Sequence, residues 1–157
     1  MDEKIEFNAH NKEEHRPSHT AEHIINRTMD NLFHCGRAVN AHIERKRSKM
    51  DFAMEEEPTA ELIAEVERTV NEVVGRNLPV TFSYIRQAEA IGRFDIRRLP
   101  EGASDTVRVV SIGDYDECLC IGQHVKSTAE IGHVSFVSHD YDAERKIFRL
   151  RYKVTGK

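Results

Sequence analysis

Two short histidine-containing motifs, about one hundred residues apart, constrain the fold of this chain more than any other feature. The first is His19–His23, which reads HTAEH, and the second is Cys120–His124, which reads CIGQH. Each motif places two metal-binding side chains four residues apart, and together they supply three imidazoles and one thiolate. Zn²⁺ binds such a set readily in tetrahedral geometry. If the fold brings the motifs together, His19, His23, Cys120 and His124 form a zinc site.

The overall composition indicates one soluble globular domain. The chain has 157 residues, of which 39% are hydrophobic and 32% are charged, and a chain of this length can bury a core without disulfide bonds. We expect residues 1–16 to form a polar N-terminal segment and residues 17–157 a single domain. No apolar run approaches the roughly 18 residues that span a bilayer, and the start at Met1–Lys4 lacks the apolar core of a secretory signal. We therefore expect a cytoplasmic protein with no membrane partner.

The three cysteines point to chemistry other than disulfide formation. Cys35, Cys118 and Cys120 cannot all pair within one chain, and a reducing compartment keeps thiols free. Cys118 and Cys120 are too close in sequence for an easy mutual disulfide. We therefore expect metal binding or simple packing for these two side chains.

The charge distribution allows only a limited nucleic-acid footprint. The net charge of −4 argues against broad, sequence-indifferent binding, which needs a basic surface. However, Arg45, Lys46, Arg47 and Lys49 form a basic block, and the C-terminal end from Arg145 to Lys153 is also basic. Such runs are most often solvated surface. The alternative is a local edge that contacts phosphates at one end of an RNA.

Hydrophobic periodicity predicts two principal helices. The first begins at Ser18 as N-cap, after Pro17, and ends at Gly36. Its apolar side chains recur on one face, beside which His19 and His23 lie one turn apart. The second begins at Pro58 and Thr59 and ends at Gly75. The apolar positions of the two helices are Ala21, Ile24, Ile25, Met29, Leu32, Phe33, Leu62, Ile63, Val66, Val70, Val73 and Val74.

The remaining segments alternate as strands. Residues 39–43 and 50–54 predict a β-hairpin whose turn carries the basic block, and residues 107–112 and 115–119 predict a second hairpin that leaves Cys120 at a strand end. Further strands are expected at 80–84, 134–136 and 148–154, with a brief helix at 87–92 and a loop at 93–105. The prediction is an α+β fold of two layers, in which one antiparallel sheet packs against two principal helices.

Neither half of the predicted site is decisive alone. The His19/His23 spacing also suits surface histidines at a helix start, and Cys120 also suits a buried thiol beside an unrelated His. A metalloprotease helix needs Glu directly after the first His, where this chain has Thr20. Zinc-finger pairs, a phosphate-binding Gly-rich loop and a Gly-x-Ser-x-Gly elbow are absent from the sequence.

The order of the motifs resembles one known family. The segments are HTAEHIIN at His19–Asn26, MDF at Met50–Phe52, VRVV at Val107–Val110 and LCIGQHVKSTAEIG at Leu119–Gly132. Together they resemble the editing domain of alanyl-tRNA synthetases and, more closely, the freestanding AlaX-type trans-editing proteins. Threonyl-tRNA synthetases carry a similar second domain. The resemblance covers nearly the whole chain from about Arg16 onward.

The resemblance implies zinc held by the four residues above and hydrolysis of the ester that joins a wrong serine or glycine to tRNA(Ala). The partner is then the acceptor end of a tRNA, and Zn²⁺ either activates water or orients the ester. The chain is too short to carry a synthetase core as well, so aminoacylation is not expected. The implied catalytic residues are Thr20 and His124. The implied substrate-binding residues are Thr20, His34, Gly122, Gln123, Arg45, Lys46 and Arg47.

Departures from the family pattern leave the substrate open. The usual Cys-Gly-Gly-Thr-His is altered at Ile121 and Gln123, and His34–Arg37 replaces a segment in which Gln precedes Gly-Ser. The Thr20 hydroxyl either reads a polar substrate side chain or helps to cap its helix. Two alternatives remain: a non-catalytic, zinc-stabilised relative that binds RNA or protein, and a deacylase for Ser-tRNA(Thr) or another aminoacyl ester.

Overall fold

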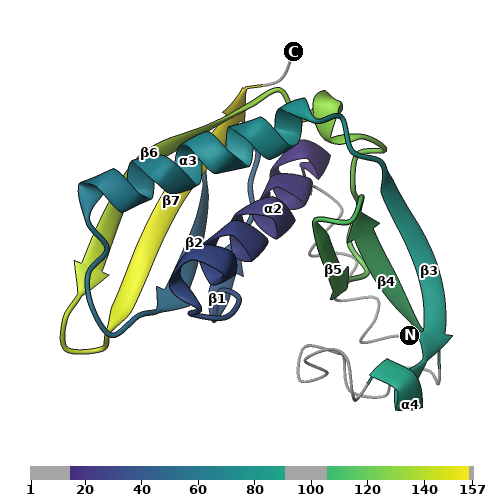
Figure 1. The fold of residues 1–157 in the computed structure, drawn as a ribbon, viewed down its shortest axis with the longest axis horizontal. Coiled ribbons are helices and arrows are strands. Elements are labelled where there is room, and N and C mark those ends of the chain that lie inside the picture. Colours follow the sequence, from purple (N-terminus) through teal and green to yellow (C-terminus); the bar gives the residue numbers. More distant parts are fainter. Residues whose placement is uncertain (1–14, 91–105, 156–157) are drawn as a thin grey trace.

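The computed structural model describes residues 15–90 and 106–155 (Figure 1). The predicted α+β class is confirmed, and the described strands pair antiparallel throughout. No helix within these ranges is long and apolar enough to cross a membrane. The elements in chain order are α2 (Arg16–Phe33), β1 (Asn40–His42), β2 (Ser48–Ala53), α3 (Ala60–Gly75), β3 (Val80–Arg86), α4 (Gln87–Ala90), β4 (Thr106–Ile112), β5 (Asp116–Leu119), the 3₁₀ turn η2 (Thr128–Glu130), β6 (His133–Asp142) and β7 (Ile147–Thr155).

The described strands form two sheets, and not the single sheet predicted from the sequence. The larger sheet has the order β1-β2-β7-β6, and the smaller has the order β3-β4-β5. Both predicted hairpins are present, because β1 pairs with β2 and β4 pairs with β5. Alternation alone cannot assign a strand to a sheet, since it records only which face of the strand is buried.

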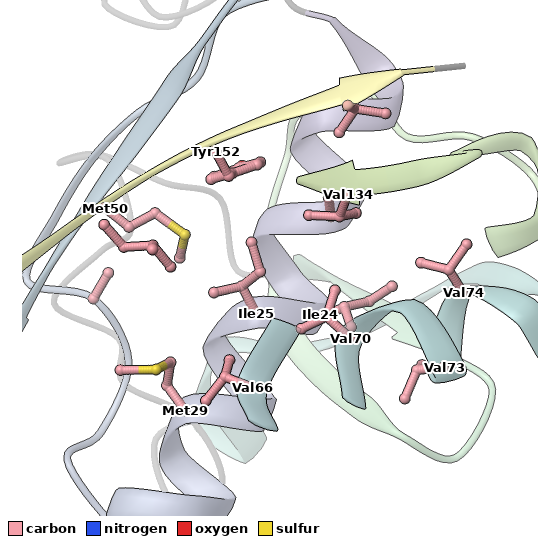
Figure 2. Close-up of a cluster of buried hydrophobic side chains, with 14 of the residues drawn as sticks. Ile24, Ile25, Met29, Met50, Val66, Val70, Val73, Val74, Val134 and Tyr152 are labelled. Carbon is pink, nitrogen blue, oxygen red and sulfur yellow. The ribbon is translucent and has the colours of Figure 1, made fainter. Parts of the chain in front are cut away.

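Helices α2 and α3 cover one face of the larger sheet, and α2 also contacts β5 of the smaller sheet (Figure 1). Alternate side chains of β7, including Phe148, Leu150 and Tyr152, are buried on that face. Ile24 and Ile25 of α2 meet the valines of α3 in the same core (Figure 2). Helix α2 therefore lies between the two sheets, and its residues can reach both.

The starts of the two helices differ. Thr59 is the N-cap of α3, as predicted, and its side chain accepts a hydrogen bond from the backbone N–H of Leu62. The predicted N-cap of α2 is wrong, because α2 begins at Arg16 and Ser18 lies buried inside its first turn. Pro17 explains the earlier start, since a proline fits the first turn, where its missing N–H needs no partner.

Two predictions fall mainly on residues that the structure does not describe. The polar segment 1–16 is described only from His15, and the loop 93–105 lies outside the described residues. The division into an N-terminal segment and one domain stays a prediction. The short helix expected after β3 is present as α4.

Candidate metal centre

The two sequence motifs meet in the fold. His19 and His23 lie on α2, and Cys120 and His124 lie in the loop after β5. One potential ligand atom from each of the four side chains lies within 4.8 Å of all the others. The His19 and His124 rings stack with centroids 4.1 Å apart, and the Cys120 Sγ is 3.3 Å from His19 Nε2. This group can hold a metal ion.

Arg108 on β4 fixes the path of the loop that carries Cys120 and His124. Its Nε donates to the carbonyl of Cys120 at 2.8 Å, and its Nη2 donates to the carbonyl of Gly122 at 2.5 Å. The guanidinium also lies 4.4 Å from the centroid of the Phe82 ring on β3. The smaller sheet therefore positions half of the candidate ligands, while α2 positions the other half.

Two of the imidazoles are oriented by hydrogen bonds at Nδ1. His19 Nδ1 is 2.9 Å from the carbonyl oxygen of Gln123, so it donates there. His124 Nδ1 is 2.9 Å from Thr20 Oγ1, which also accepts from the backbone N–H of Val125 at 3.2 Å. Both rings then turn Nε2 away from these partners. His124 Nε2 is buried without a hydrogen-bond partner, so it is available to a metal at the centre of the cluster; His23 Nδ1 is the other buried nitrogen of the cluster without such a partner.

His23 lies beside a carboxylate, without a hydrogen bond to it. Its Nδ1 lies 3.6 Å from Asp116 Oδ2, and Asp116 is also held by Arg37 and Arg27. Burial by itself would raise the pKa of Asp116, but its contacts with His23 and Arg37 outweigh burial and hold that pKa well below the usual range. Asp116 is therefore ionised inside the protein.

The electrostatics favour the metal-binding forms of His124 and Cys120. Burial by itself would lower the pKa of His23, but Cys118 and Asp116 raise that pKa well above its ordinary value. Burial lowers the pKa of His124 to about 4, so its ring is neutral near pH 7. Burial by itself would raise the pKa of the Cys120 thiol, but hydrogen bonds from His124, His19 and His23 hold it well below its ordinary value. A neutral imidazole and a thiolate are the forms that bind metals.

The other predicted site residues lie at different distances from the cluster. Thr20 is completely buried against His124, and Gln123 accepts a hydrogen bond from Arg16 Nε at 3.0 Å. His34 is exposed at the opposite end of α2, about 20 Å from His19 at 1.5 Å per helical residue. The structure does not bring His34 to the cluster.

The predicted basic block Arg45–Arg47 is exposed in the turn between β1 and β2. His15 directly precedes α2, and its pKa is lowered mainly by burial and to a smaller extent by the positive charge of Arg45. The basic block therefore lies near the same end of α2 as His19.

Several side chains around the cluster were not predicted from the sequence. Asp116 was not singled out, although an Asp inside a hairpin strand is seldom buried unless it is paired. Glu22 places its Oε1 3.6 Å from His19 Nε2, and its position three residues after His19 could have indicated this. Arg108 gave no signal, because its partners are backbone carbonyls far along the chain.

Comparisons with known proteins identify relatives of this chain. Residues 107–147 match the family described as the threonyl and alanyl tRNA synthetase second additional domain. The chain is 35% identical over 124 residues to alanine–tRNA ligase of Bacillus subtilis, and 36% identical over 123 residues to that of Acidothermus cellulolyticus. Each match covers 77% of this chain and 14% of the relative, so the chain corresponds to a small part of those enzymes. The resemblance inferred from the sequence is confirmed: residues 107–147 match the second additional domain of threonyl and alanyl tRNA synthetases, and 77% of the chain is similar to a part of alanine–tRNA ligase.

Proposed function

We propose that this protein is a zinc-dependent aminoacyl-tRNA deacylase that hydrolyses Ser-tRNA(Ala) or Gly-tRNA(Ala) in trans, in the cytoplasm. The observation that carries the proposal is the meeting of three imidazoles and one thiolate in a chain similar to alanine–tRNA ligase. The family match supports a tRNA partner and a hydrolytic editing role.

The residues present fit Zn²⁺. His19, His23, Cys120 and His124 form the nitrogen and sulfur set that zinc prefers, and the unpartnered His124 Nε2 needs such a neighbour. When bound, zinc supplies Lewis acidity that lowers the barrier to ester hydrolysis.

Residues of the chain itself would orient the reaction. Thr20 holds the His124 ring through Nδ1, so that Nε2 keeps its direction. Glu22, nearly buried on the same helix, offers a carboxylate that can accept the proton of the attacking water. Water adds to the ester carbonyl carbon, the bond to the ribose oxygen breaks, and that oxygen takes up a proton. The products are the free amino acid and an uncharged tRNA.

The surface around the cluster suits the end of a single-stranded nucleic acid. Phe82 and Tyr84 on β3 are exposed, and the Phe82 ring centroid lies 6.3 Å from that of His124. An aminoacyl ester at the cluster places its terminal base within reach of these rings, and bases stack on exposed aromatic side chains. The block Arg45–Arg47 near the start of α2 would contact acceptor-stem phosphates.

A deacylation assay tests the proposal. Purified protein with a measured zinc content is incubated separately with Ser-tRNA(Ala), Gly-tRNA(Ala), Ser-tRNA(Thr) and Ala-tRNA(Ala). We expect release of serine or glycine from tRNA(Ala) and no release of alanine. Zinc-loaded protein that hydrolyses none of them would contradict the proposal and favour a zinc-stabilised binding protein. Hydrolysis of Ser-tRNA(Thr) alone would place the substrate in the threonyl branch.

A further inference from the structure

The carboxylate of Asp116 occupies a completely buried position beside His23. Its side chain has no exposed surface, and its Oδ2 lies 3.6 Å from His23 Nδ1. Asp116 is the first residue of β5, four positions before Cys120. A buried carboxylate is costly unless it is paired, so its partners explain why it lies there.

Two guanidinium groups hold this carboxylate in one orientation. Arg37 donates from Nη1 to Oδ1 at 2.9 Å and from Nη2 to Oδ2 at 3.1 Å, which is the two-pronged geometry that fixes a carboxylate plane. Arg27, one turn after His23 on α2, donates from Nε to Oδ1 at 3.0 Å. Asp116 therefore joins β5, α2 and the segment after α2, and it cannot rotate without breaking these hydrogen bonds.

The three imidazoles share one arrangement. Nδ1 of His19 faces the Gln123 carbonyl, Nδ1 of His124 faces the Thr20 hydroxyl, and Nδ1 of His23 faces Asp116. The first two contacts are hydrogen bonds at 2.9 Å, whereas His23 Nδ1 lies 3.6 Å from the carboxylate and is buried without a hydrogen-bond partner. Each Nδ1 still has an oxygen atom on its side of the ring, which leaves Nε2 as the nitrogen for a metal. Among these three oxygen partners only that of His23 is charged. A carboxylate behind a metal-binding imidazole fixes its tautomer and increases the basicity of the opposite nitrogen.

We propose that Asp116, held by Arg37 and Arg27, is a positioning residue that keeps the proton of His23 on Nδ1 and directs Nε2 at the metal. The proposal rests on the proposed metal centre and adds a residue that the sequence motifs do not contain. It predicts that removing one carboxylate charge weakens metal binding while the four ligands remain in place.

The chain offers a matched control for the experiment. Asp51 on β2 forms a second nearly buried, two-pronged ion pair, with Arg149 on β7, at 2.7 and 2.9 Å. None of its described hydrogen bonds and ion pairs involves the candidate ligands. Asp116→Asn and Asp51→Asn therefore remove the same charge from similar pairs, one beside His23 and one away from it.

The affinity of each variant for Zn²⁺ is measured by competition with a chromophoric chelator, and the visible spectrum of the Co²⁺-loaded protein is recorded. We expect Asp116→Asn to bind Zn²⁺ about 10–100-fold more weakly and to alter the Co²⁺ spectrum. Asp51→Asn should leave both unchanged. Equal weakening in the two variants, or wild-type affinity in Asp116→Asn, would overturn the proposal. Wild-type protein that binds neither metal would instead overturn the proposed metal centre.

A second measurement applies if Asp116→Asn does not fold. Nitrogen-15 NMR of the zinc-loaded wild-type protein identifies which nitrogen of each ring carries a proton. We expect a protonated, hydrogen-bonded Nδ1 on His23 and a metal-bound Nε2. A metal-bound or unprotonated Nδ1 on His23 would overturn the assignment of Asp116.

Discussion

The two sheets use their aromatic side chains differently. In the larger sheet, Phe52, Phe148 and Tyr152 are at most 1% exposed. In the smaller sheet, Phe82 is 46% exposed and Tyr84 is 67% exposed. The strands that carry these side chains, which are β2, β7 and β3, alternate apolar and polar residues, so the sequence pattern does not separate the two sheets. What differs is that α2 and α3 cover the larger sheet.

This difference indicates that the aromatic side chains of the two sheets have different roles. Large aromatic side chains in the covered sheet contribute stability through burial. In the smaller sheet, Phe82 remains exposed beside the candidate metal centre, and Tyr84 is exposed two residues further along β3. The comparison predicts that substitutions in the larger sheet change unfolding, whereas substitutions around the smaller sheet change metal binding or catalysis.

The largest effect is expected in the larger sheet. Phe148 on β7 lies opposite Phe52 on β2 and is 1% exposed, so Phe148→Ala leaves a cavity in the core. We expect the free energy of unfolding to fall by about 3–5 kcal/mol. Denaturant titration measures the change. Zinc affinity per folded molecule should be unaltered, and a variant that is stable but binds no zinc would break the comparison.

The metal centre should show the opposite behaviour. Cys120→Ala removes the only thiolate among the four candidate ligands. Removing a residue that only hydrogen-bonds to a ligand costs up to about 100-fold in metal affinity, and we expect the loss of a ligand itself to cost more. Deacylation should be lost as well. Cys35→Ala is the matched control, because Cys35 lies outside the cluster. Chelator competition and the deacylation assay measure both variants. Full activity in Cys120→Ala would contradict the catalytic assignment. His19→Ala should lose zinc binding and deacylation in the same way as Cys120→Ala.

We expect the exposed rings of Phe82 and Tyr84 to affect hydrolysis only when the substrate carries a nucleobase. We expect Phe82→Ala and Tyr84→Ala to raise KM for aminoacyl-tRNA about 5–150-fold, which corresponds to the 1–3 kcal/mol of one base stacked on an aromatic ring. Hydrolysis of a serine ester without a nucleotide should not change. Val137→Ala is the control, because Val137 is 42% exposed on β6 of the larger sheet. An equal loss on both substrates would assign these rings to the structure of the site instead.

The sequence predicted the elements better than their assembly. Helices α2 and α3, both hairpins and the final strand pair follow from periodicity and from Gly75 and Thr59 at element ends. The separation into two sheets was not predicted, because the alternation of apolar and polar residues along a strand does not show which other strands it pairs with. The start of α2 was misplaced because Ser18 is also a common N-cap residue, and its burial against the core has no local signal.

The four clustered residues could be predicted because metal ligands need particular side chains at short spacing. The residues that hold these four side chains in place could not be predicted from the sequence. Arg108 donates hydrogen bonds to backbone carbonyls, and Asp116 accepts hydrogen bonds from Arg37, which lies seventy-nine positions away in the sequence. Such contacts depend on tertiary packing rather than residue type. His34 shows the opposite limit: it was chosen by comparison with a family pattern, yet α2 carries it away from the cluster.

The smallest expected effect concerns how the larger sheet depends on pH. The hydrogen bonds from Arg149 lower the pKa of Asp51 below its ordinary value of 3.8. Asp51 binds a proton more readily in the unfolded chain, so its contribution to stability is present above about pH 4 and is lost as pH falls through the lowered pKa. We expect Asp51→Asn to cost about 1–3 kcal/mol at pH 7, and the difference from wild type to shrink as the pH falls below about 4. Denaturant titrations of both proteins at several pH values measure it. A difference that stays constant down to pH 2 would mean that packing of the side chain, and not its charge, joins β2 to β7.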